Sequence, residues 1–320
     1  MEIRWDAMTR AEWDAALPPG ACALQHGWAY GAAMAAMGAQ VHRAEISDNG
    51  QRALAQVICR DFGRVLRVGY LARGPVWQCA VDAAGERATM RLIRRTLPGG
   101  GVLLASPDRP VAGLVPLMTP VHVAELALTP DRETLRRRLH GKWRNRLVRA
   151  EAAGLRITVC QPEPASLDWL IARDIAQQRA RGYRALPGGF ARAWGRDGRV
   201  MLSAHRDGKT VAAMLFLDHA PGVTYQIGWT SDAGRANSAH NLLLWRAMLH
   251  FADLGRRRLD LGMLDTETAP GLARFKLGTG ARARALGSSG ICLPGWPVGL
   301  RRLRSGQTSR HDPGHGRDIA

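Results

Sequence analysis

The sequence predicts an α/β protein built from two similar domains, each with a mixed, mostly antiparallel sheet, and with a cleft between them. Three observations support this prediction. The 320 residues, 46% of them hydrophobic, are enough for two ordinary cores. Helical and strand-like patterns alternate along the chain. Their order, a helix, paired strands, a helix and a strand, occurs twice. We therefore assign residues 1–125 to a first domain, 126–303 to a second, and 304–320 to a disordered polar tail.

The first domain begins with two helical segments within residues 10–38. The strand-like segments that follow are separated by Asp48-Asn49-Gly50, a turn sequence that predicts a hairpin. Residues 65–77 are expected to form a strand that runs into a loop. A helix over 83–97 and strands over 101–107 and 121–128 complete the domain.

The second domain opens with a long helix that starts at Asp131. A second hairpin is predicted across Asp207-Gly208, between strands rich in apolar residues. The remaining expected elements, in order, are a strand over 155–160, a helix over 167–181, a strand over 222–230, a helix over 238–254, a strand over 257–262 and a short helix over 269–278.

Composition limits the function classes. A net charge of +18 favours polyanionic partners, such as RNA, nucleotide phosphates or an anionic membrane face. No apolar run reaches the roughly 20 residues that span a bilayer, and the N-terminus lacks the layout of a secretory signal, so we expect a cytoplasmic protein. The cysteines are scattered, which argues against a disulfide framework or a zinc site: Cys22, Cys59, Cys79, Cys160 and Cys292.

The most basic stretch is LHGKWRNRLVRAEAAGLRI, residues 139–157. At helical spacing, Leu139, Trp143 and Leu147 share an apolar face with Leu135 and Ala150. Arg137 and Arg144 lie on the opposite, solvent side. For Arg136–Arg138, a solvated basic face is as good an interpretation as contact with an anion. The cations that flank the apolar face stand where a cleft wall would be, and we expect them to contact an anion: Lys142, Arg146 and Arg149.

Three motifs, taken in order, resemble the FemAB family of peptidoglycan aminoacyltransferases, part of the GNAT acyltransferase superfamily. The first is ARGPVW, residues 72–77. The second is Arg-x-Arg followed by Ala-Glu-x-x-Gly, at Arg144 to Gly154. The third is DLGMLDTETAPGLARFKLGTGA, residues 260–281. The resemblance covers residues 20–300. It implies two tandem GNAT-like domains and acyl transfer from aminoacyl-tRNA to an amine of a cell-wall precursor at the inner membrane face.

The resemblance implies that Phe275 and Lys276 match the family's catalytic pair. A fixed cation can stabilise the oxyanion that forms when an amine attacks an ester or thioester. Lys276 is one of only three lysines among 45 basic residues, so a compact ammonium is expected to matter at this position. The alternative is a structural salt bridge to Asp260 or Asp265.

The resemblance also implies an acceptor site. Arg179 and Tyr183 lie four residues apart at the end of a predicted helix, hence on one side of it. With Tyr225 they fall where the family contacts its phosphate-bearing acceptor; the alternative is core tyrosines with satisfied hydroxyls. Arg73 either binds phosphate or ties a loop. The family's substrate-binding lysine in the first domain has no counterpart, because no lysine precedes Lys142.

The donor is the open question. GNAT enzymes bind the pyrophosphate of coenzyme A on a Gln/Arg-x-x-Gly-x-Gly/Ala loop at a helix N-terminus. Here that loop is GRANSAHN, residues 234–241, where Ser238 and His240 replace the small residues after Arg235. Ser238 can still cap the helix, and Asn241 completes the expected donor site. The departure favours aminoacyl-tRNA over acyl-CoA.

Other chemistries have little support in the sequence. His311 and His315 lie four apart in the expected tail with no third ligand, so no metal site is predicted. His240 or His250 could serve as a base. We therefore expect an N-acyltransferase that uses aminoacyl-tRNA, with acyl-CoA as the alternative donor. A non-catalytic RNA-binding protein is the alternative outside enzymes.

Overall fold

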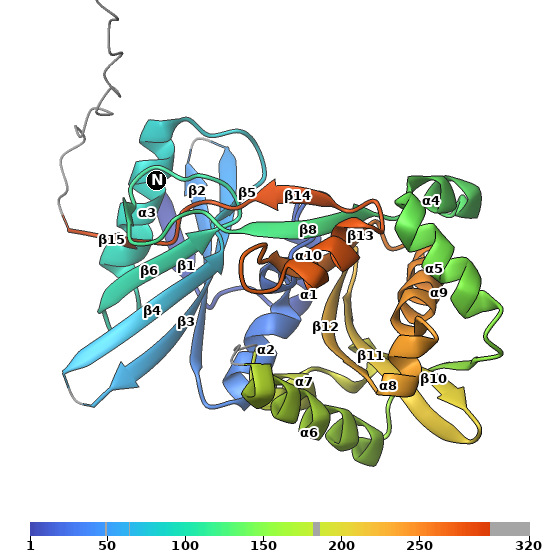
Figure 1. Ribbon diagram of the computed structural model, residues 1–320. Coiled ribbons are helices and arrows are strands. Elements are labelled where there is room, and N and C mark those ends of the chain that lie inside the picture. Colours follow the sequence, from blue (N-terminus) through green and yellow to red (C-terminus); the bar gives the residue numbers. More distant parts are fainter. Residues whose placement is uncertain (49, 64, 182–185, 295–320) are drawn as a thin grey trace, which may run out of the picture.

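The computed structural model describes residues 1–48, 50–63, 65–181 and 186–294. It confirms a mixed α/β fold with two mostly antiparallel sheets, which lie side by side in Figure 1. Within the described ranges, no helix has the length and apolar character needed to cross a membrane. Tyr183, His311, His315 and the predicted tail lie outside these ranges.

The first sheet has eight strands in the order β1-β2-β3-β4-β6-β15-β7, with β5 also paired to β3. Neighbours are antiparallel except for β4 and β6. The predicted hairpin is present, because Asp48 pairs with Gln51. The strands are β1 (Glu2–Trp5), β2 (Gln40–Asp48), β3 (Gln51–Phe62), β4 (Leu66–Arg73), β5 (Val76–Trp77), β6 (Val102–Pro107), β7 (Val115–Pro116) and β15 (Gly290–Cys292).

The second sheet has seven strands in the order β14-β8-β13-β12-β11-β10-β9. It repeats the pattern of the first, since only β12 and β13 run parallel. The hairpin predicted across Asp207-Gly208 joins β10 to β11. The strands are β8 (His122–Ala127), β9 (Arg156–Cys160), β10 (Arg199–Arg206), β11 (Lys209–His219), β12 (Gly222–Thr230), β13 (Arg258–Leu264) and β14 (Arg282–Ala285).

The chain passes between the sheets twice. The expected division at residue 125 falls inside β8, all of which pairs in the second sheet. The strand pairing therefore puts the first crossing before His122. After β14 the chain returns, and β15 pairs with β6 and β7 of the first sheet. The C-terminal segment thus connects the two lobes, each of which consists of one sheet and the helices that pack on it.

Helices cover the sheets on the faces where apolar residues recur. α3 (Ala83–Thr96) buries Met90 and Ile93 on the first sheet. On the second sheet, α5 (Gly141–Glu151) and α9 (Ala239–Asp253) pack on one face and α6 (Pro164–Arg181) on the other (Figure 1). The other helices are α1 (Arg10–Ala16), η1 (Leu24–His26), α2 (Trp28–Ala36), α4 (Arg132–Arg138), α7 (Gly188–Ala193), η2 (Arg196–Gly198), α8 (Asp232–Ala236) and α10 (Pro270–Leu277).

The prediction of one long helix from Asp131 is wrong in one respect, because this segment forms two helices. α4 ends at Arg138, and His140 adopts an extended conformation as the N-cap of α5. The reason is a tertiary hydrogen bond, because the His140 amide donates to the Gly278 carbonyl oxygen at 2.9 Å. The predicted apolar face survives the break: Leu135, Leu139, Trp143, Leu147 and Ala150 are all buried in one core.

Candidate active site

Strands β12 and β13 diverge at the centre of the second lobe. They pair only from Gly222–Arg258 to Thr224–Asp260, after which β12 remains bonded to β11 alone. Both strands are also irregular there. The pairing of β12 with β11 shifts between Leu215 and Phe216, and that of β13 with β8 shifts between Asp260 and Met263. Such irregularities are common beside active sites, where they change the direction of a side chain.

A pocket of about 390 Å³ lies at the N-terminus of α9. It brings together donor-site residues that were predicted from separate parts of the sequence, and it also includes Phe275. Its walls come from α5, the end of β12, α8, the start of α9 and α10. The lining residues are Arg146, Arg149, Thr230, Gly234, Arg235, Ala236, Ser238, Ala239, His240, Asn241 and Phe275. A larger hollow of about 460 Å³ lies over α3 in the first lobe and contains none of the predicted site residues.

The pocket is electropositive for two physical reasons. Arg146 and Arg149 are exposed on α5, and neither forms an ion pair with any residue that the structure describes. The N-terminus of the 15-residue helix α9 adds the positive end of its dipole. Arg235 is engaged locally, since its guanidinium contacts Asp232 and donates to the Thr230 carbonyl oxygen at 2.9 Å. These groups could hold a phosphate.

Two side chains at the start of α9 explain the local geometry. Ser238 is the N-cap residue with φ = 52°, in the left-handed region, and its side chain makes no capping hydrogen bond. The expectation that it caps the helix is therefore wrong, because a capping side chain needs an extended backbone at that position. Asn241 is 5% exposed, and its Nδ2 has no hydrogen-bond partner among the residues that the structure describes. A buried amide donor of this kind favours an acceptor in the pocket.

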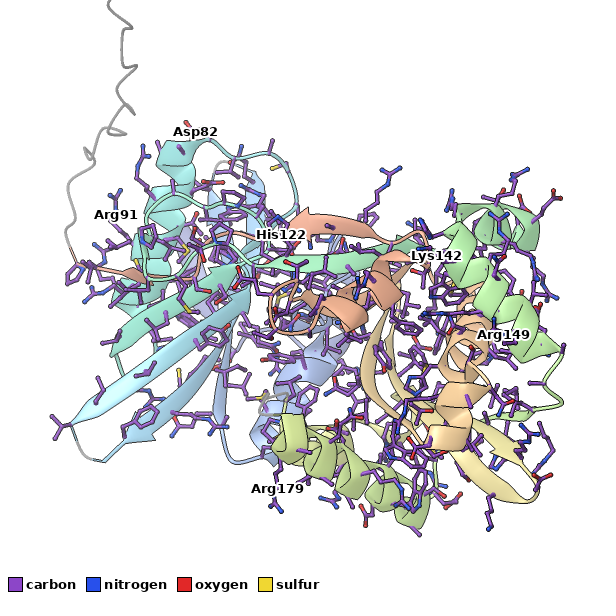
Figure 2. All side chains as sticks on the ribbon, viewed as in Figure 1. Asp82, Arg91, His122, Lys142, Arg149 and Arg179 are labelled. Atoms are coloured by element: carbon purple, nitrogen blue, oxygen red, sulfur yellow. The ribbon has the colours of Figure 1, made fainter. Side chains whose placement is uncertain are left out.

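Lys142 does not line the pocket. It is exposed near the N-terminal end of α5, whereas Arg149 lies at the other end of that helix (Figure 2). Arg137 and Arg144 are exposed, as predicted. Arg136 is engaged with Glu151 at 2.8 Å, which fits the solvated basic face considered for this segment.

Phe275 and Lys276 stand on α10 with different surroundings. Phe275 lines the pocket, and its ring centroid lies 6.2 Å from those of Trp143 and His240. Lys276 is 6% exposed, and its Nζ donates to the Met263 carbonyl oxygen at 2.8 Å. Burial lowers the pKa of Lys276 to about 8, against the opposing charge of Asp260.

The alternative role for Lys276 is a structural salt bridge. Among the described residues, Lys276 forms no ion pair with Asp260 or Asp265. Asp265 instead accepts hydrogen bonds from the amides of Glu267 and Thr268 in its own turn. The buried ammonium therefore keeps donors for another group, although Lys276 is not among the lining residues of the pocket.

Arg73 lies in a cluster of charged groups between the lobes, which sequence reasoning did not find. It is 9% exposed, with Nη1 at 2.8 Å from Asp108 and Nη2 at 3.6 Å from Asp260. Arg284 then joins Asp108 at 2.9 Å to Glu125 at 2.7 Å. Burial opposes ionisation of Asp108, but the bonds and charges of Arg284 and its neighbours outweigh it and lower its pKa. Of the two roles considered for Arg73, this geometry favours the structural tie.

The other predicted acceptor residues are not brought together. Arg179 is exposed on α6 and points away from the protein (Figure 2). Tyr225 is half-buried against Phe216, with ring centroids 5.5 Å apart. Its hydroxyl lies 1.7 Å from where a Cβ on Gly228 would stand, so a side chain at position 228 would force the Tyr225 ring to move. No cluster of three or more potential metal ligands occurs within the described ranges.

Comparisons with known proteins agree with this geometry. Residues 136–277 match the family described as "Acetyltransferase (GNAT) domain", a segment that contains α5, α9 and Lys276. No curated protein matches the sequence significantly.

Solved structures match over nearly the whole chain. The structure of FemX is 13% identical with a TM-score of 0.74, and the match covers 92% of this chain and 97% of FemX. A conserved protein of unknown function from Bacteroides thetaiotaomicron is 14% identical, with a TM-score of 0.55 and coverage of 91% and 100%. The C-terminal domain of a proposed lysylphosphatidylglycerol synthetase from Agrobacterium fabrum is 15% identical, with a TM-score of 0.53 and coverage of 82% and 87%.

At these identities the structural matches concern the fold alone, whereas the family match identifies the second lobe. Together they confirm the FemAB-like fold that the sequence motifs indicated. Residues 136–277 of the chain match a GNAT acetyltransferase domain, which supports an acyltransferase, and the chain has a FemX-like fold of two GNAT-like lobes.

Proposed function

We propose that this protein transfers an acyl group from aminoacyl-tRNA to an amine, with a phosphate of the donor bound at the N-terminus of α9. One observation carries the proposal. The pocket there combines a helix N-terminus, the cations Arg146 and Arg149 and the amide of Asn241, and within the described part of the chain these three side chains have no ion-pair partner or, for the Asn241 Nδ2, no hydrogen-bond partner. A phosphate accepts hydrogen bonds from each of these donors.

The chemistry follows from the bonds that change. The acceptor amine attacks the ester carbonyl of the donor, a C–N bond forms, and the carbonyl oxygen becomes an oxyanion. The C–O bond to the donor then breaks, and the amine loses a proton. A buried ammonium stabilises the oxyanion strongly because little water competes with it, and Lys276 is the group proposed for this role.

The basic surface supports tRNA as the donor. Exposed cations continue beyond the pocket along α4 and α5, including Arg137, Lys142 and Arg144. A polynucleotide has further phosphates to place on such a surface, whereas coenzyme A has few. This donor would place the reaction in the cytoplasm. The proposed acceptor is an amine of a cell-wall precursor at the inner membrane face.

Acyl-CoA is the second candidate donor, and the conformation of Ser238 favours it. This residue stands where the coenzyme A loop of GNAT enzymes has its first glycine, and its φ of 52° is the conformation that favours glycine. The backbone here therefore has the shape of a pyrophosphate loop even though the residue is serine. A purely RNA-binding protein would have no use for the buried ammonium of Lys276.

Competition binding tests the donor. Purified protein is titrated with fluorescent aminoacylated tRNA at fixed salt, and then challenged with either acetyl-CoA or uncharged tRNA. We expect uncharged tRNA to displace the fluorescent tRNA at micromolar concentration and acetyl-CoA to displace it only weakly. Mass spectrometry of protein purified from cells should also detect bound tRNA. Tight binding of acetyl-CoA with no binding of tRNA would instead establish the second candidate.

A further inference from the structure

We infer that Arg73 and Asp260 are positioning residues: Arg73 of the first lobe holds Asp260, which fixes the irregular part of β13 whose Met263 carbonyl orients the Lys276 ammonium. The first lobe would thus set the position of the catalytic cation in the second. This inference rests on the proposed role of Lys276 in acyl transfer.

The first link is the bulge in β13. Asp260 pairs with Glu125 of β8 and Met263 pairs with Val123, so one extra residue lies on β13 between these pairs. Gly262 lies at this bulge and has φ = 80°, a conformation that suits glycine. The Asp260 Oδ1 accepts a hydrogen bond from the Gly262 amide at 2.7 Å and so fixes the bulge.

The second link joins the bulge to the ammonium. The Met263 side chain is 62% exposed, whereas its carbonyl oxygen turns inward and accepts the Lys276 Nζ at 2.8 Å. A Cβ on Gly262 would stand only 3.6 Å from Nζ, so the ammonium packs directly over this glycine. A change in the bulge would therefore move both the acceptor and the surface on which Lys276 rests.

The third link crosses between the lobes. Arg73 ends β4 of the first sheet, and its Nη2 lies 3.6 Å from the Asp260 Oδ2. Its backbone has φ = 61°, which is costly for a residue with a side chain. The buried His26 hydrogen-bonds the Arg73 carbonyl oxygen at 3.0 Å, and Asp108 holds its other nitrogen at 2.8 Å. Arg73 is thus fixed at three points and can act as a rigid support.

The charges around these groups give a signature that packing alone would not. Asp260 is the charged group that acts on Lys276, and it raises the lysine pKa against the effect of burial. Burial raises the pKa of Asp260 itself, opposed first by Arg73, while Glu125 raises it further and Arg258 lowers it. Removal of the Asp260 charge should therefore make Lys276 lose its proton at lower pH.

The test uses lysine NMR, because the chain has only Lys142, Lys209 and Lys276. Side-chain labelled lysine gives three signals, and Lys142→Arg and Lys209→Arg assign them. In Asp260→Asn an oxygen still accepts from the Gly262 amide but the charge is gone. We expect the Lys276 signal to titrate at lower pH than in the wild type, and kcat to fall about tenfold with donor KM changed less than twofold.

Two further variants separate geometry from charge. Gly262→Ala keeps every charge but strains the bulge and crowds Nζ, and Arg73→Lys keeps a cation but loses the two-carboxylate contact. Both should lower kcat about tenfold with little change in donor KM. Asp218→Asn is the matched control, since Asp218 forms a half-buried ion pair with Arg256, whose Nε lies 2.6 Å from the Asp218 Oδ1, whereas Asp260 is the charged group that acts on Lys276. This variant should leave the Lys276 titration and kcat unchanged.

The outcomes are distinct. If Asp260→Asn, Gly262→Ala and Arg73→Lys are folded and leave both the Lys276 titration and kcat at wild-type values, the inference is wrong. If one of them fails to fold, the remaining variants still decide, because each breaks a different link. If Lys276→Ala keeps full transfer activity, the proposed function fails, while the NMR titration still reports whether Asp260 controls this lysine.

Discussion

Phe275 and Lys276 are neighbours on α10, yet Phe275 lines the pocket at the N-terminus of α9 and Lys276 hydrogen-bonds the Met263 carbonyl of β13 at 2.8 Å. α10 therefore connects the pocket to the place where β12 and β13 diverge. A donor bound by its phosphate at the α9 N-terminus would have its acyl carbonyl near this junction.

Removal of the two unpaired pocket cations should weaken donor binding. Arg146→Ala/Arg149→Ala deletes two charge-assisted contacts to phosphate, so we expect a loss of about 10- to 100-fold in donor affinity at low salt. The slope of log Kd against log salt should also fall by about 1.4 if both residues contact single-stranded phosphates. Fluorescence anisotropy measures both quantities.

The control for this variant is Arg91→Ala. Arg91 is an exposed arginine on α3 in the first lobe, far from α5 in Figure 2. It should leave donor affinity and the salt slope within twofold of the wild type. An equal loss in both variants would show that net charge, rather than this pocket, drives binding.

Asn241 offers a test that separates binding from stability. Asn241→Leu removes the amide whose Nδ2 has no partner among the described residues, so the protein should keep or gain stability while donor affinity falls about tenfold. Asn241→Asp puts a negative charge in the pocket and should weaken binding further. Donor titration and thermal melting check the two effects. Unchanged affinity in both variants would exclude Asn241 from the site.

Ser238→Gly should stabilise the fold. Its φ of 52° costs a residue with a side chain about 1 kcal/mol, and the serine hydroxyl makes no capping bond that would be lost. We therefore expect the free energy of unfolding to rise by about 0.5–1 kcal/mol in urea denaturation, with donor affinity kept or improved. A destabilised variant would mean that the hydroxyl has a role in the folded protein that this account lacks.

The pH dependence of transfer should reveal Lys276. Burial brings its pKa down to about 8, so the ammonium is present below that pH and lost above it. The attacking amine needs the opposite, since it reacts unprotonated. The ratio of the wild-type rate to that of Lys276→Ala removes the contribution of the amine, and it should fall as pH rises through about 8. A ratio that stays constant from pH 6 to 10 would exclude a titrating ammonium.

Local sequence patterns predicted much of the fold. The turn residues Asp48-Asn49-Gly50 and Asp207-Gly208 defined the hairpins, and the helical spacing of Trp143 and Leu147 identified a buried face. Two features had no local signal. The break at His140 is imposed by a hydrogen bond to Gly278, and the three-residue strand β15 is defined by pairing with β6, far away in sequence.

Some residues of the candidate site were likewise predicted from local patterns, whereas others are brought together only by tertiary packing. Arg146, Arg149 and the loop before α9 meet in one pocket because an amphipathic helix and a helix N-terminus each have a recognisable pattern. The contact of Arg73 with Asp260 has no such pattern, because it depends on how the two lobes pack. For Arg179, the helical spacing correctly predicted a position on a helix, but it did not show that the side chain faces solvent.

The most direct test of the central claim is single-turnover transfer by Lys276→Ala at saturating donor, with donor Kd measured on the same protein. Loss of one preorganised charge at the oxyanion predicts a rate constant lower by about 10²- to 10³-fold and a Kd within about threefold of the wild type. A rate constant equal to that of the wild type, at equal Kd, would contradict the account.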